Sequence, residues 1–152
     1  MASTIKETHE QGLERGSLDT LLGFQLRRAQ LKLFQHFKSS MADLPITPGQ
    51  AGVLILIESN PGISQAALAR AMDIERATLG ETINDLEAHL WVERRKSTND
   101  GRSHALYLSA KGKNIMKKLH PAIDTHEKDI SGNLSASECR ELLRLLMKFN
   151  AS

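Results

Sequence analysis

The chain has 152 residues, of which 40% are hydrophobic and 25% are charged, and its net charge is +2. That length and hydrophobic content predict one globular domain and exclude a disordered chain, and no apolar run approaches the ~20 residues of a membrane-spanning helix. The N-terminus lacks a signal-peptide core and the single cysteine cannot form an internal disulfide, so we expect a cytoplasmic protein without membrane contact.

Residues 1–16 are polar and unpatterned, and we expect them to form a flexible N-terminal arm. A helix is predicted over 17–40, because apolar residues recur there at steps of three and four. These residues are Leu18, Leu22, Leu26, Ala29, Leu33 and Phe37, with Leu21, Phe24, Leu31 and Phe34 beside them. A helix that is apolar on two sides must cover its own core and also either a partner subunit or a ligand.

Two short helices follow, and each begins with a capping signal. Thr47, Pro48 and Gln50 form a capping box with proline at the first helical position, and the apolar helix that they open ends at the breaker cluster 60–62. This helix is nearly all apolar, so we expect it to be buried. Ser64 can cap the next helix, which ends at a tight turn over 72–75.

A longer helix is predicted from Glu75 to Leu90. Its inner stripe, at helical spacing, is Leu79, Ile83, Leu86 and Leu90. At about 100° per residue, the opposite face carries Ala77, Gly80, Glu81, Asn84 and Ala88. The small residues on this face would allow close approach to another molecule.

A hairpin comes next, with arms over 92–96 and 103–108 and an Asp-Gly turn signal at its tip. Strand alternation places His104, Leu106 and Leu108 on one face of the second arm. Two helices complete the chain. Ser109 caps a long helix that runs towards Ile130, and Pro121 is expected to kink or divide it. A second capping box at 135–138 opens the last helix, whose apolar stripe is Leu142, Leu145, Leu146 and Phe149.

The charges of the chain are unevenly distributed. Residues 92–118 contain eight basic and two acidic side chains, whereas residues 58–89 contain two basic and six acidic ones. A polyanion would therefore be attracted mainly by the hairpin and by the helix that follows it.

The order of helix, turn, helix and hairpin is the layout of a winged helix-turn-helix. In the motifs SQAALARAMDIERATL, INDLE and NDGRSHALYLSAKG, the chain resembles the MarR family of bacterial transcription regulators, and the resemblance extends from about Leu18 to the last helix. It implies a mainly α fold with a small β-hairpin wing, to which Gly62-Ile63 can add a short strand. It also implies a winged helix-turn-helix DNA-binding domain over 41–109 and a helical dimerisation region made of 17–40 and 110–152.

The function implied by the resemblance is that of a homodimeric transcription regulator that responds to a small molecule. We expect a repressor of neighbouring genes that binds a pseudo-palindromic operator in double-stranded DNA. The remaining alternative is a winged helix that docks on another protein through its acidic second helix.

The resemblance also indicates which residues contact DNA. Members of the family carry an Asp-x-Arg at the wing tip, where the Arg enters the minor groove, and Asp100 and Arg102 match this pattern. The alternative for Arg102 is a solvated hairpin tip. The residues predicted to bind DNA are Ser64, Gln65, Arg76, Ala77, Thr78, Gly80, Glu81, Asn84, Arg94, Asn99, Asp100 and Arg102.

Two positions depart from the family pattern. Many relatives have basic residues where this chain has Glu81 and Asp85. Glu81 could repel DNA, accept a hydrogen bond from a cytosine N4 amine, or pair with Arg76 of the same helix. Leu90 stands where relatives usually have glycine in the left-handed conformation, so either a strain of about 1 kcal/mol is borne or the helix ends differently. Trp91 is predicted to be a core residue.

An effector site is implied where the first, second and fifth helices of the family meet the DNA-binding part. An aromatic acid needs an apolar slot with one cation at its mouth, and Arg27 or Arg28 could be that cation. Both could equally be solvated or paired across the dimer. Some relatives respond to aromatic acids or their coenzyme A thioesters, whose phosphates the basic segment 111–118 could meet, although that segment could equally meet DNA. The predicted effector-binding residues are Phe24, Gln25, Arg27, Arg28, Leu31, Phe34 and His36.

Nothing in the sequence predicts catalysis. The six histidines show no metal-site spacing, and there is no Gly-rich phosphate loop. Cys139 stands alone in the last helix, where a role in packing or at an interface is favoured over reactivity. We therefore expect no enzymatic activity, no metal ion and no cofactor.

Overall fold

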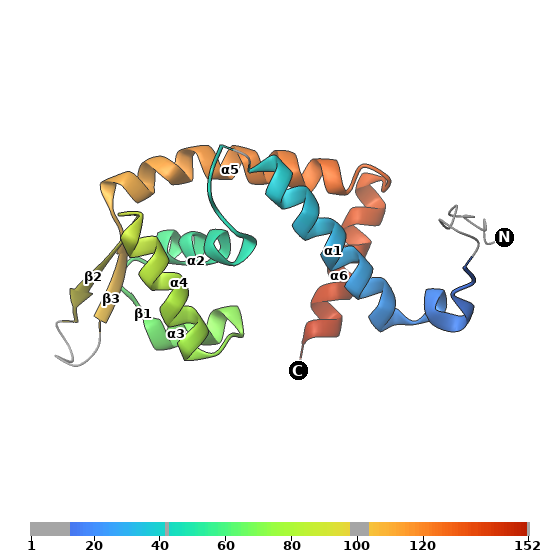
Figure 1. The fold of residues 1–152 in the computed structure, drawn as a ribbon, viewed down its shortest axis with the longest axis horizontal. Helices are drawn as coiled ribbons and strands as arrows, with labels where there is room; N and C mark the ends of the chain where they lie inside the picture. Colours follow the sequence, from blue (N-terminus) through green and yellow to red (C-terminus); the bar gives the residue numbers. More distant parts are fainter. Residues whose placement is uncertain (1–12, 42, 98–103, 152) are drawn as a thin grey trace.

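The computed structural model of the chain describes residues 13–41, 43–97 and 104–151. Two lobes are joined by one long helix, α5 (Ala110–Ile130), which runs along one side of the molecule (Figure 1). One lobe contains α2 (Pro48–Ser59), β1 (Ile63–Ser64), α3 (Gln65–Met72), α4 (Arg76–Ala88), β2 (Val92–Lys96) and β3 (His104–Leu108). The other contains the 3-10 helix η2 (Gly16–Thr20), α1 (Leu22–Ser40) and α6 (Ala136–Asn150). This mainly helical fold with a small sheet confirms the predicted fold class.

The hydrophobic core lies in the lobe that contains the sheet. It is formed by the apolar α2, by one face each of α3 and α4, and by the inner face of the strands, and α5 covers it with Met116 and Leu119. Leu79, Ile83 and Leu86 of α4 have no exposed surface, as their helical spacing predicted. Leu90, which was predicted to continue this stripe, is 66% exposed, so that part of the prediction is wrong.

The sheet has three antiparallel strands in the order β1-β3-β2. Val92 pairs with Leu108 and Lys96 with His104, so β2 and β3 form the predicted hairpin. Ile63 pairs with Leu106, which confirms that the segment before α3 adds a third strand. Leu106 and Leu108 are buried on the core face, whereas His104, nearer the hairpin tip, is exposed.

Each predicted capping signal is used. Thr47 and Gln50 form a reciprocal capping box at the start of α2, with distances of 3.2 Å and 3.0 Å between backbone nitrogen and side-chain oxygen. Ser135 and Glu138 form the second box, at the start of α6. The hydroxyls of Ser64 and Ser109 accept hydrogen bonds from the first turns of α3 and α5. These bonds satisfy amide groups that a helix start otherwise leaves unpaired.

Two predictions about long helices are corrected or decided by the structure. The helix predicted over 17–40 is interrupted, because Leu21 is extended, with φ −83° and ψ 123°, between η2 and α1. By contrast, α5 continues through Pro121 as one helix. Proline removes one backbone hydrogen bond, but its fixed φ is helical, so a helix packed along its length can contain it. None of the helices in the described ranges is long and apolar enough to span a membrane.

The lobe made of α1 and α6 has little core of its own. Phe37 is the buried residue of α1, and α6 has none. The predicted stripe of α6 lies largely in water, with Leu142 47% and Phe149 61% exposed. The apolar faces of these two helices are therefore uncovered in the single chain.

Candidate DNA interface and ligand cavity

The turn between α3 and α4 is closed by Asp73 in the left-handed conformation, with φ 53°. The amide of Asp73 bonds to the Arg70 carbonyl, and the amide of Ile74 bonds to the Ala69 carbonyl at 3.1 Å. This pair of bonds is the Schellman arrangement, and Asp tolerates its left-handed position better than most side chains. The turn fixes the angle at which α4 leaves α3, which completes a helix-turn-helix.

The outer face of α4 is exposed, as the periodicity predicted. Arg76, Ala77, Thr78, Glu81 and Asn84 all have exposed side chains. Gly80 is half-buried because the side chain of Gln65 lies over it, with Gln65 Nε2 3.3 Å from the position of a Cβ at residue 80. The structure thus brings Gln65, at the start of α3, onto the same surface as the centre of α4.

Glu81 remains free to face another molecule. Glu81 and Arg76 both lie in the described part of the chain, and no ion pair joins them there. The interpretation in which they pair within the helix therefore loses its support. The other two interpretations of this exposed side chain, acceptance of a base amine and repulsion of DNA, stay predictions.

Arg94 of β2 binds α4 instead of extending into solvent. Its Nη2 donates to Asn84 Oδ1 at 2.8 Å, and its Nε lies 3.3 Å from a Glu87 carboxylate oxygen. The amide oxygen of Asn84 is thereby occupied, and the amide nitrogen is left to donate to another molecule. Arg94 consequently orients Asn84, and its predicted direct contact with DNA stays a prediction.

The described strands of the wing carry further cations. The Arg95 guanidinium lies 4.3 Å from the centre of the Tyr107 ring and 3.1 Å from Glu93. Sequence analysis did not single out Arg95, although its position opposite the strand that carries Tyr107 could have suggested this stacking. Asn99, Asp100 and Arg102, the predicted wing-tip contacts, lie outside the described residues.

The end of α4 decides between the two possibilities left for Leu90. Leu90 has φ 61°, so the left-handed strain is borne by a leucine. Its amide bonds to the Glu87 carbonyl at 2.8 Å, and the amide of Trp91 bonds to the Leu86 carbonyl at 3.0 Å. This second Schellman arrangement turns Leu90 outward and Trp91 inward, and Trp91 is 3% exposed, as predicted for a core residue.

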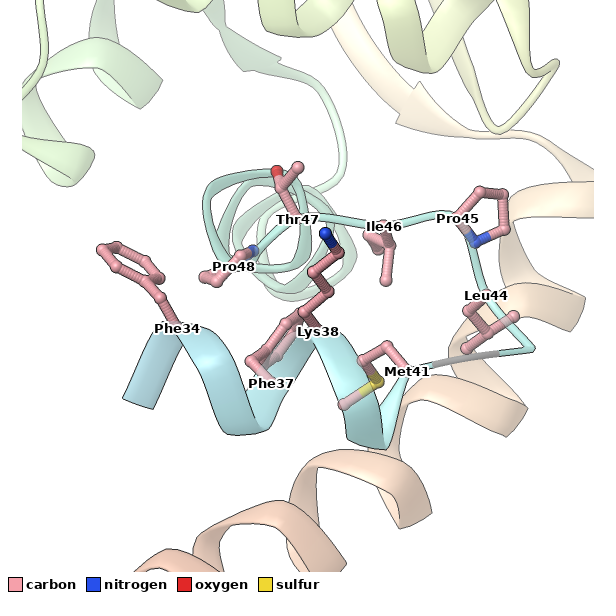
Figure 2. Close-up of a pocket in the computed structure, with 9 residues that line it drawn as sticks. All are labelled: Phe34, Phe37, Lys38, Met41, Leu44, Pro45, Ile46, Thr47 and Pro48. Atoms are coloured by element: carbon pink, nitrogen blue, oxygen red, sulfur yellow. The ribbon is translucent and has the colours of Figure 1, made fainter. Parts of the chain in front are cut away.

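A cavity of about 490 Å³ lies between the C-terminal half of α1 and the chain that leads into α2 (Figure 2). Its walls are mainly apolar, and the Lys38 side chain lies across it near Thr47 and Pro48 (Figure 2). The lining residues are Phe34, Phe37, Lys38, Met41, Leu44, Pro45, Ile46, Thr47 and Pro48.

Of the predicted effector-binding residues, Phe34 lines this cavity and the others do not. Phe24 lies under the Arg15 guanidinium, and the Gln25 amide donates to the Asp19 carbonyl at 2.7 Å. His36 contacts α5, whereas Arg27, Arg28 and Leu31 lie further towards the start of α1. The cation of the cavity is Lys38, which sequence analysis missed. Its position four residues after Phe34, on the same helical face, was the available signal.

A second cavity, of about 380 Å³, lies on the other side of the loop after α1. It shares Met41 and Leu44 with the first cavity, and its charged lining residues are Lys118 of α5 and Asp43 of the loop. The two cavities therefore flank one short loop, and each has a lysine in its wall.

The chain is similar to known proteins over most of its length. The sequence profile of the MarR family matches residues 44–103. A protein of Thauera aromatica, assigned as a transcriptional regulatory protein for the hcr operon, is 35% identical over 137 residues, which cover 90% of this chain and 82% of that protein.

Solved structures agree with this match. The transcriptional repressor CouR bound to a 23-mer DNA duplex is 33% identical with a TM-score of 0.88, and the match covers 91% of this chain and 99% of that one. CouR bound to p-coumaroyl-CoA is 31% identical with a TM-score of 0.84, and the match covers 90% and 96%. With its helix-turn-helix, its three-stranded wing and these relatives, the chain belongs to the MarR family of DNA-binding transcriptional regulators.

Proposed function

We propose that this chain is a homodimeric repressor that binds a pseudo-palindromic operator and releases it when a small aromatic ligand binds. The observation that carries the proposal is the exposed outer face of α4, which lies beside a basic β-hairpin in a complete winged helix-turn-helix. The similarity to CouR, whose structure contains a DNA duplex, supports DNA as the partner.

The dimer would be formed by α1 and by the last two helices, α5 and α6. Monomeric soluble proteins rarely leave large contiguous apolar patches in water. Here apolar side chains of α1 and α6 remain exposed, and both helices lie in the half of the molecule away from the sheet (Figure 1). We therefore assign 17–40 and 110–152 to dimerisation and 41–109 to DNA binding. A two-fold axis would then place two copies of α4 about one helical turn of DNA apart, which requires a pseudo-palindrome.

Within each half-site, α4 would enter the major groove and the wing would follow the minor groove. Ala77 and Gly80 leave room for the bases, Asn84 offers its amide nitrogen, and Glu81 would accept from a cytosine amine. Because α4 adds negative charge, the affinity must come mainly from cations of the wing such as Arg95 and Arg102, and from Ser64 and Gln65 at the start of α3.

The ligand would occupy the 490 Å³ cavity beside Phe34 and Lys38, whose size and apolar walls are typical of small-molecule sites. The ring of an aromatic acid would contact Phe37 and Met41, and Lys38 would meet its carboxylate. CouR binds an aromatic acyl thioester of coenzyme A. In this chain Lys118 would meet a phosphate of such a thioester at the second cavity, whose wall also carries the Asp43 carboxylate.

Release would be a shift between two arrangements of the dimer, of which the ligand favours the one whose α4 helices no longer match the groove spacing. Linkage requires the ligand to bind the free dimer more tightly than the operator complex. Calorimetry that gives equal ligand affinities for the free and the DNA-bound dimer would rule this mechanism out.

The test is operator binding by fluorescence anisotropy, with DNA fragments from the region around the chain's own gene and increasing salt. We expect binding that weakens steeply as salt rises from about 50 to 300 mM, and that weakens about tenfold in Arg102→Ala at constant salt. Lys128→Ala, in the last turn of α5, is the matched control: where gel filtration gives the same dimer as the wild type, it should bind as the wild type does. If no fragment is retained at low salt, the proposal fails and the protein-docking alternative gains.

A further inference from the structure

Two histidines that are far apart in the sequence meet where α1 packs on α5. The Nδ1 atoms of His36 and His126 are 2.8 Å apart, and the ring centres are 5.0 Å apart. His126 is 5% exposed, and the Phe37 ring packs edge-on against it at 5.2 Å. The Ser40 hydroxyl is 2.9 Å from the same nitrogen of His36. This pair, of which His126 is buried and His36 half-buried, does not line either cavity.

The geometry limits how many protons the pair can hold. At 2.8 Å, one Nδ1 must donate and the other must accept, so a single proton lies between the two rings. If both rings became imidazolium, two N–H groups would point at each other and two positive charges would be in contact. A first added proton can enter at the outer Nε2 of the donor ring and leave the shared hydrogen bond intact, but a second added proton makes both rings imidazolium and therefore cannot enter without separating them.

The groups around the pair shift the pKa of His126. Burial lowers the pKa of His126, and the neighbouring His36 lowers it further, whereas Glu127 and Asp129 of α5 act in the opposite direction. The Asp129 carboxylate is 3.9 Å from the outer nitrogen of His36. On α1, Lys38 lines the cavity. A histidine with a lowered pKa stabilises the fold above its unfolded pKa of about 6.5, and this stabilisation is lost as the pH falls below that value.

The position of the pair connects it to the rest of the molecule. Phe37 forms part of the cavity wall on one side and contacts His126 on the other. A separation of the two imidazoles would move α1 relative to α5, which is the helix that continues from the wing. A change at this joint would consequently alter the cavity and the spacing of the two DNA-binding lobes in a dimer.

We propose that the His36–His126 pair is a proton-operated latch between α1 and α5: its shared hydrogen bond holds the operator-binding arrangement near neutral pH, and a second proton opens it and weakens operator binding. This inference rests on the proposed function, because its readout includes DNA affinity. It makes acidification a second release signal that needs no ligand.

The experiment has two readouts on the full-length protein. Imidazole ¹⁵N shifts of selectively labelled protein between about pH 8 and 5 report each ring separately. We expect His126 to take up a proton only well below about pH 6.5, the pKa of a histidine in an unfolded chain, because burial and the neighbouring ring disfavour its charged form. A His126 signal that changes near about pH 6.5 would overturn the latch.

The second readout is operator affinity at constant ionic strength at about pH 7.5 and 5.5. We expect the wild type to lose about tenfold more affinity on acidification than His36→Gln or His126→Gln, because glutamine can hydrogen-bond but cannot take a proton. His120→Gln, an exposed histidine of α5 that pairs with Glu58 and lies outside the DNA-binding face, is the matched control for general effects of a histidine substitution and should follow the wild type. His36 is half-exposed, so its variant should fold even if that of His126 does not.

Parallel pH curves for the wild type and His36→Gln would show that the pair does not control binding, and the latch would be abandoned while the proposed function stood. Absence of DNA binding at every pH would instead overturn the proposed function and the regulatory role together. The nitrogen shifts would still show in that case whether the pair shares a proton.

Discussion

Gly112, in the first turn of α5, lies against the carbonyl of Trp91, and a Cβ at residue 112 would overlap that oxygen. The same carbonyl accepts the amide of Ser109 at 3.0 Å. The start of α5 is thus packed directly on the backbone that follows α4. This contact connects the end of α4 to the long helix that leads to the other lobe.

The contact predicts the effect of Gly112→Ala. Alanine in a helix interior normally adds stability of up to about 1 kcal/mol over glycine. Here we expect a loss of about 2–3 kcal/mol, because backbone cannot move aside as a flexible side chain can. Urea unfolding at one fixed protein concentration measures the difference. Gly49→Ala in α2, where a Cβ would meet nothing within 4 Å, is the matched control and should not be destabilised.

The left-handed backbone and the exposed side chain of Leu90 predict that a substitution at this position stabilises the protein. A leucine at φ 61° is strained in a left-handed conformation that glycine adopts freely. Its side chain is 66% exposed, so its removal loses little packing. We expect Leu90→Gly to raise the free energy of unfolding by about 0.5–1 kcal/mol after the entropy of glycine is deducted. Leu90→Ala keeps the strain and should change stability little. A destabilised Leu90→Gly would show that the exposed leucine makes a contact in the dimer or with DNA.

Arg94 and Asn84 are expected to act together in DNA binding. If Arg94 orients the Asn84 amide, Arg94→Ala and Asn84→Ala should each weaken operator binding, and the double variant should be little worse than either one. A double-mutant cycle by anisotropy should give a coupling free energy of about 1 kcal/mol. Glu93→Ala, on the same strand, is the control and should be additive with Asn84→Ala. Additive effects of Arg94 and Asn84 would indicate that each contacts DNA independently.

Lys38 is expected to favour ligands that carry a negative charge. With p-coumarate as the probe, Lys38→Ala should raise the ligand dissociation constant about tenfold, because a carboxylate would lose its charged partner. Lys38→Arg should retain most of the affinity. Arg27→Ala, at an exposed position outside the cavity, should leave ligand binding unchanged. If Arg27→Ala has the larger effect, the ligand binds elsewhere on α1.

The local features of this protein follow from its sequence because they depend on neighbours a few residues apart. The capping boxes of α2 and α6 and the buried stripe of Leu79, Ile83 and Leu86 require hydrogen bonds and spacings within one or two turns. The family motifs predicted the helix-turn-helix and its wing for the same reason, because these motifs occupy one continuous stretch of the chain.

Only the tertiary structure decided the features that join distant segments. The sequence left two possible endings for the helix at Leu90, and the structure selects the left-handed turn that rotates Leu90 out of its stripe. The cavity needs the loop before α2 to return over α1, which made Lys38 its cation in place of Arg27 or Arg28. His36 and His126 are 90 residues apart and meet because α5 crosses α1. Periodicity shows which face of a helix is apolar. The partner of that face depends on how whole helices and strands pack, and the packing energy is a sum over contacts between distant residues, which no local sequence pattern contains.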